Sequence, residues 1–128
     1  MTGSRRLLAL GAVSGFLAVA LGAFGAHGLE GKVDEHLQKV FETGARYQMY
    51  HALALLVCAW VSRECSEAWA ARAGGCFVIG TVLFSGSLYL RVLLDQKWLG
   101  AITPLGGLAF LAGWVCLACA SAGTHPQP

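Results

Sequence analysis

The chain has 128 residues, of which 56% are hydrophobic and only 12% are charged, and its formal net charge is +2. Soluble domains carry roughly 25% charged residues, so the composition favours a protein surrounded by lipid rather than water. The net charge is small and no basic run alternates with aromatic residues, which excludes nucleic-acid binding. The length predicts one integral membrane domain covering residues 1–128.

The first predicted element is a helix over 6–27. Residues 7–26 contain no charged side chain and are about as long as a helix that crosses the hydrocarbon layer. Arg5 and Arg6 before this stretch resemble the start of a signal peptide, but signal peptides have a shorter apolar core of about 7–15 residues. We therefore expect the helix to remain as the first span. Small residues form a stripe that lets a neighbouring helix approach closely: Gly11, Ser14, Gly15, Ala18 and Gly22.

The second predicted element is a helix over 34–62 whose first part is polar. Gly28 and Gly31 end the first helix, and Asp34 can cap the next one. After about Tyr47 the sequence becomes apolar, which indicates an amphipathic extension leading into the second span. Two pairs of opposite charge lie at the i,i+4 spacing on the polar face: Glu35–Lys39 and Glu42–Arg46.

The opposite face of this helix carries two polar residues toward the interior. At 3.6 residues per turn, Gln48 and His51 share a face with Leu37, Phe41 and Leu55. Hydrocarbon offers no hydrogen-bond partner, so both polar side chains need a partner inside the protein.

The third and fourth predicted elements are helices over 70–94 and 103–122, each with a long uncharged stretch. Thr103 and Pro104 are typical of an N-cap and a first helical position. Small and polar residues align on one face of the third helix: Cys76, Gly80, Ser87 and Arg91. The predicted fold class is all-α, a four-helix transmembrane bundle with an amphipathic extension leading into the second span.

Four spans place both termini on one side of the membrane and residues 27–46 and 95–103 on the other, here called the histidine end. Lys and Arg residues near span ends normally indicate orientation. They are balanced between the two sides of this chain, so the orientation stays open.

The histidine end gathers the polar residues that could form a site. A polar cluster inside a membrane protein is by default a functional hypothesis. We expect His27 to fold back toward His51, Gln48 or Arg91, because the ends of the first three spans meet at that depth. The cluster is predicted either to bind a ligand or to close this end of the bundle by internal hydrogen bonds, and we favour the second. Its members are His27, Glu42, Gln48, His51, Tyr89, Arg91 and Thr103.

Other chemistry finds little support. Cys116 and Cys119 form a C-x-x-C inside an apolar helix, where small packing residues are expected. A zinc site lacks a third ligand in a suitable pattern, and the serines lack the G-x-S-x-G context of a nucleophile. No carboxylate lies in a span, and no broken helix or inverted repeat favours a transporter. We therefore expect no metal, no cofactor and no catalytic residue.

Four segments of the chain resemble the YgdD family, small four-span membrane proteins of unassigned function from bacterial inner membranes, with mitochondrial relatives. They are GAFGAHGL (22–29), FETGARYQMYHALALL (41–56), LFSGSLYL (83–90) and ITPLGGLAFLAGW (102–114). The resemblance implies an integral membrane protein and a compact helical bundle, and it brings no activity or cofactor.

Two functional hypotheses remain. The first is a non-catalytic protein of the bacterial inner membrane, an accessory component or a homo-oligomer packed through small-residue faces such as those of Gly11, Gly15 and Gly80. The alternative is a haem-, quinone- or lipid-binding membrane protein that uses His27, His51 and Arg91. The bilayer is a partner in both.

Overall fold

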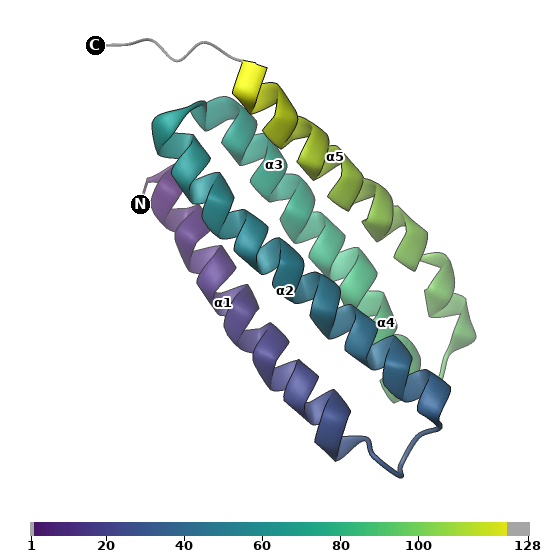
Figure 1. The fold of residues 1–128 in the computed structure, drawn as a ribbon. Coiled ribbons are helices and arrows are strands. Elements are labelled where there is room, and N and C mark those ends of the chain that lie inside the picture. Colours follow the sequence, from purple (N-terminus) through teal and green to yellow (C-terminus); the bar gives the residue numbers. More distant parts are fainter. Residues whose placement is uncertain (1, 123–128) are drawn as a thin grey trace.

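A computed structural model describes residues 2–122, and in this part of the chain every regular element is a helix (Figure 1). The π-helical turn η1 extends α1, and a second π-helical turn, η2, joins α3 to α4. The 3-10 helix η3 leads into α5. The elements are α1 (Gly3–Ala23), η1 (Phe24–Gly28), α2 (Glu35–Glu64), α3 (Glu67–Gly80), η2 (Thr81–Ser85), α4 (Gly86–Leu94), η3 (Lys97–Ala101) and α5 (Thr103–Ala122).

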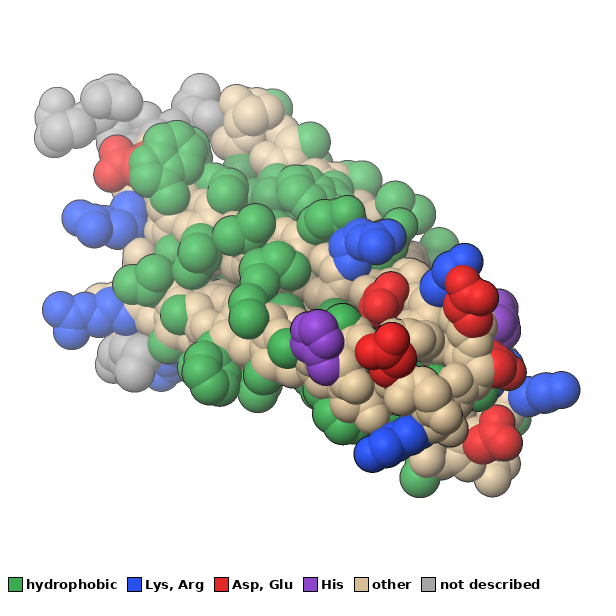
Figure 2. Space-filling view, turned by 60° about the horizontal axis from the view of Figure 1, so that its bottom comes forward, with side chains coloured by type: hydrophobic (Ala, Val, Ile, Leu, Met, Phe, Trp, Pro, Cys, Tyr) green, Lys and Arg blue, Asp and Glu red, His purple; other side chains and the backbone are tan. Residues whose placement is uncertain are grey.

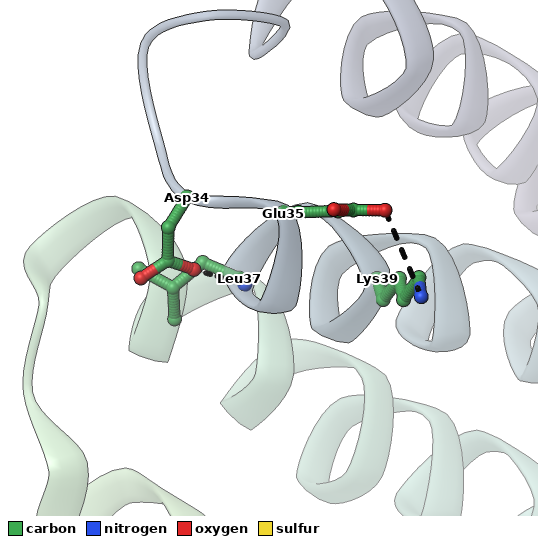
Figure 3. A network of polar contacts seen from close by, with 4 residues as sticks. All are labelled: Asp34, Glu35, Leu37 and Lys39. Atoms are coloured by element: carbon green, nitrogen blue, oxygen red, sulfur yellow. Dashed lines mark hydrogen bonds and ion pairs between the residues drawn. The ribbon is translucent and has the colours of Figure 1, made fainter.

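The polar segment before α2 folds as its local sequence dictates. Asp34 is the N-cap, and its side-chain oxygen accepts a hydrogen bond of 2.7 Å from the Leu37 amide (Figure 3). One turn later Lys39 lies 3.9 Å from Glu35 on the exposed face. Among the described residues this is the ion pair that forms, and the expected Glu42–Arg46 pair is absent. α2 then continues without a break to Glu64.

The helices form an open row rather than a closed ring. α2 and α3 lie at the centre, α1 packs on α2, and α5 packs on α3 (Figure 1). α1 begins at the end of the molecule where α5 finishes, and the α1–α2 and α4–α5 connections lie at the histidine end. Because α2 touches α1, α3, α4 and α5, its face with Gln48 and His51 is covered by protein from several sides.

The predicted small-residue stripe of α1 is the surface that α2 covers. Gly11 and Ala18 are buried. A methyl group added at Gly11 would lie 2.7 Å from a Leu56 methyl and 2.9 Å from the Ala52 carbonyl oxygen. At Gly15 and Gly22 the same addition would reach Ala52 and Ala45 at ordinary contact distances of 3.8 and 3.7 Å. The close approach therefore depends most on Gly11.

The contact between α3 and α5 pairs glycines with phenylalanines. Gly80 faces Phe110, and Gly113 faces Phe77. Phe77 and Phe110 are both buried in the main hydrophobic core. The absent side chains of the glycines make room for the aromatic rings, so each pair interlocks like a knob and its hole.

The middle of the molecule exposes apolar side chains, and charges gather at its two ends (Figure 2). Phe16 is 73% exposed, Val82 65% and Leu111 63%. Three continuous helical stretches of the described chain are long and apolar enough to cross a membrane: Gly3–Gly28, Glu67–Leu94 and Lys97–Ala122. α2 is not among them, since its first half carries the charged face. The all-helical expectation is confirmed, whereas a four-span bundle is only partly supported.

Candidate functional site

Gln48 links three helices at the centre of the predicted polar cluster. Its buried side chain donates from Nε2 to the Ser14 carbonyl oxygen of α1 at 3.1 Å. Its Oε1 accepts a hydrogen bond of 2.6 Å from the Tyr89 hydroxyl of α4. The amide therefore uses both its donor and its acceptor inside the protein. The prediction that Gln48 faces the interior is confirmed, and Tyr89 is one of its partners.

His51 is held by α5 rather than by the other members of the cluster. Its Nδ1 lies 2.7 Å from the Tyr47 carbonyl oxygen, and its Nε2 lies 3.1 Å from the Trp114 indole nitrogen. An indole N–H can only donate, so Nε2 is the acceptor and the proton sits on Nδ1, which donates to Tyr47. The ring also stacks on Phe110, with centroids 3.6 Å apart and planes within 3°. A neutral imidazole thus has both nitrogens engaged.

The end of the π-helical turn η2 and the first turn of α4 bring two serine hydroxyls to the neighbouring helices. Ser85 donates to the Gly44 carbonyl oxygen of α2 at 2.7 Å, and Ser87 lies 2.6 Å from the Thr103 hydroxyl. Thr103, expected as an N-cap, instead starts α5 and joins it to α4 through this contact. Because a π turn adds a residue to the helical repeat, it changes which side chains face the partner helix.

His27 does not take the predicted position. It is exposed at the end of η1, and the ring nitrogens of His51 are bonded to Tyr47 and Trp114 instead. The place next to η1 is filled by Gln38, whose side-chain amide donates to the Gly25 carbonyl oxygen at 3.2 Å. The wider π turn leaves carbonyl groups available for this donor. The polar cluster is therefore smaller than expected at the histidine end.

Two charged members of the predicted cluster lie apart from its centre. Glu42 is half-buried on α2. Arg91 is half-buried in the last turn of α4, and its Nη1 atom is buried with no hydrogen-bond partner in the described chain. Buried donors in proteins are nearly always paired, and this nitrogen is the one buried side-chain atom of the predicted cluster that has no partner among residues 2–122.

The partners supplied by α5 and η2 were missed by sequence reasoning. Trp114 and Phe110 lie in a helix that is apolar on all sides, so no periodicity marks the face that meets His51. A signal was still present, because membrane tryptophans concentrate at the interfaces, and a mid-span Trp114 invites the question of what its N–H bonds. Ser85 could not be placed, since the π turn shifts the helical register.

Comparison with known proteins places the chain among uncharacterised relatives. The matching family description, "Protein of unknown function (DUF423)", covers residues 21–107. The UPF0382 membrane protein YwdK of Bacillus subtilis is 48% identical over 113 residues, covering 88% of this chain and 92% of the relative. The UPF0382 membrane protein SAB0533 of Staphylococcus aureus is 47% identical over 114 residues, covering 88% and 91%.

No solved structure matches the chain. The family match includes Gln48, His51, Tyr89, Arg91 and Thr103, so the hydrogen-bonded centre and the open arginine both lie inside it. Trp114 follows the matched segment. This chain belongs to the DUF423 family of proteins of unknown function.

Proposed function

We propose that this protein crosses the membrane four times and serves as a structural or accessory component without catalytic chemistry of its own. It is an integral membrane protein, since three of its helices are long and apolar enough to span a bilayer and its Bacillus and Staphylococcus relatives are named membrane proteins. The expected location is the plasma membrane of a bacterium. We also propose, from the sequence segments that resemble them, that the YgdD proteins are relatives of this chain.

The fourth crossing is argued from the packing of α2. α2 runs antiparallel to α1, from Gly11 beside Leu56 to Gly25 beside Phe41. A helix that follows a spanning neighbour along its length must cross with it. With 30 residues α2 is about 45 Å long, while the hydrocarbon layer needs about 30 Å. The excess accommodates the charged first turns outside the lipid.

One observation carries the structural role: most buried polar side chains of the described residues are hydrogen-bonded across helix boundaries, and the unpartnered atoms are Thr81 Oγ1 and Arg91 Nη1. Gln48 joins α1, α2 and α4, and His51 joins α2 to α5. Ser87 and Thr103 join α4 to α5. Side chains arranged in this way hold a transmembrane bundle together, and their donors and acceptors are already used. A catalytic role for these side chains would require their hydrogen bonds to be broken.

Fusion of a reporter of sidedness to each terminus tests the four-span arrangement. Four crossings place both reporters on the same side of the membrane, whereas three crossings would place them on opposite sides and contradict the proposal. An internal control is Cys65, between α2 and α3, which a membrane-impermeant thiol reagent should reach from the side of the termini.

The alternative, a cofactor-binding protein using His27, His51 and Arg91, is favoured only in its lipid form. A haem iron at His51 would have to displace Trp114 from Nε2, and His27 is exposed. Among these three residues, Arg91 has the buried donor without a partner in residues 2–122. An absorption spectrum of the protein purified in mild detergent tests the haem form, since a Soret band lost in His51→Ala would support it.

A homo-oligomer or larger membrane complex is a second part of the proposal. The small residues of α1 that were expected to mediate it are covered by α2 within one chain. Next to this contact between α1 and α2 lies a groove of about 420 Å³, whose lining includes Phe16, Val19 and Leu53. A cross-linking experiment in native membranes with Phe16→Cys tests this face as the contact between copies.

A further inference from the structure

A second groove of about 420 Å³ lies toward the histidine end, between η2 and α4 on one side and η3 with Ile102 on the other. Val82, Gly86 and Leu90 form one wall, and Leu99 and Ile102 form the other. A methyl group added at Gly86 would meet no atom within 4 Å, so the groove is open over this glycine. Its apolar walls are suited to an acyl chain of a membrane lipid.

Arg91 follows Leu90, which lines this groove. Ser87, which lines the groove, lies four residues before Arg91 and therefore on the same side of the helix. Side chains on a helix lean toward its N-terminus. The continuous helical stretch α3–η2–α4 starts at Glu67, at the opposite end of the molecule. Arg91 therefore leans back toward the apolar layer instead of out to water, consistent with its buried Nη1 atom.

The described part of the chain does not neutralise this guanidinium. Asp95 is also four residues away, but it is exposed and ends α4 in the left-handed conformation, with φ 53°, which takes it out of the helical row. No ion pair of Arg91 occurs among residues 2–122. The C-terminal dipole of α4 favours a cation in its last turn, yet it provides no acceptor for Nη1.

We propose that this corner binds an anionic phospholipid, whose phosphate accepts hydrogen bonds from Arg91 and whose acyl chain lies in the groove over Gly86. A guanidinium presents parallel N–H donors that match two phosphate oxygens. An anionic lipid is favoured over a zwitterionic one because the latter carries its own ammonium beside the phosphate. The inference rests on the proposed four-span arrangement, which exposes the groove to lipid.

Native mass spectrometry in a neutral detergent tests the site with phosphatidylglycerol and phosphatidylcholine of the same acyl chains. The wild-type protein should bind phosphatidylglycerol about tenfold more tightly than phosphatidylcholine, as expected for a charge-assisted hydrogen bond. Arg91→Gln should reduce that affinity to the phosphatidylcholine value, and Arg91→Lys should retain part of the preference. Lys39→Gln, which removes an exposed cation, should leave it unchanged.

Gly86→Leu tests the groove independently of the charge and is expected to fold, because its side chain enters open space. It should weaken the binding of both lipids, whereas Gly75→Leu, at an equally open position of α3, should preserve the Arg91-dependent preference. Equal binding of the two lipids by wild type would overturn the proposal, as would an unchanged preference in Arg91→Gln. A failure of the four-span arrangement is recognised separately by the reporters at the termini.

Discussion

The centre of the molecule and the Arg91 corner both bury polar side chains, but they treat them in opposite ways. In the centre, Gln48 and His51 use donors and acceptors on partners from neighbouring helices. At the corner, the Nη1 atom of Arg91 has no partner in the described chain. The difference teaches that burial alone does not define a site: hydrogen-bonded polar groups hold helices together, whereas an unpartnered one marks the place where we propose that a ligand supplies the acceptor.

The largest expected effect comes from removing the imidazole of His51. His51→Leu leaves the Trp114 N–H without its acceptor and removes the stacked ring from Phe110. We expect a loss of about 3 kcal/mol in the free energy of unfolding in detergent, measured by denaturant titration. His36→Leu, at an exposed position of α2, is the control and should unfold like wild type. If both variants did so, His51 would have no structural role.

Gln48 is expected to have the next largest effect. Gln48→Leu leaves the half-buried Tyr89 hydroxyl without an acceptor, at a cost of about 2 kcal/mol. Adding Tyr89→Phe removes the unpaired hydroxyl, so the double variant should be more stable than Gln48→Leu alone. Strictly additive losses in the double-mutant cycle would mean that the two side chains are not coupled.

Substitutions at the glycines of α1 test the close packing of α1 on α2 separately from the hydrogen bonds between helices. Gly11→Ala places a methyl group 2.7 Å from Leu56 and should destabilise the protein by about 1.5 kcal/mol. Gly15→Ala meets Ala52 at 3.8 Å, an ordinary contact, and should change stability by less than about 0.5 kcal/mol. Thermal unfolding of both in one detergent measures the contrast, and the reverse order would disprove the packing of α1 on α2.

The smallest effect is expected for Arg91 in the absence of lipid. Arg91→Gln removes a donor that has no partner in the described chain, so the free energy of unfolding in neutral detergent should change by less than about 0.5 kcal/mol. Lys39→Ala, which breaks an exposed ion pair, should do as little. A loss from Arg91→Gln as large as that from His51→Leu would show that the corner is closed by the protein itself.

The buried face of α2 was predictable from the sequence, and its partners were not. Helical spacing alone placed Phe41, Gln48 and His51 on one side, and all three are buried. The stripe through Gly11 also predicted close helix packing, although its partner is α2 of the same chain. These features repeat with the period of a helix, which local sequence reveals.

Features that depend on the π turns or on the choice of partner helix escaped prediction. His27 was expected beside His51 on grounds of depth, but depth does not fix the direction in which η1 directs a side chain. The contact of Trp114 with His51 joins residues 63 positions apart, and nothing in the apolar sequence of α5 selects that face. Arg91 was a candidate from sequence, whereas its unpartnered Nη1 required coordinates.

The account is tested most directly by unfolding wild type, His51→Leu and Arg91→Gln in neutral detergent with and without added phosphatidylglycerol. A ligand that binds the folded state stabilises it. We predict that the lipid raises the melting temperature of wild type and of His51→Leu by similar amounts and leaves that of Arg91→Gln unchanged. Equal stabilisation of Arg91→Gln and wild type would contradict the distinction between a closed centre and an open corner.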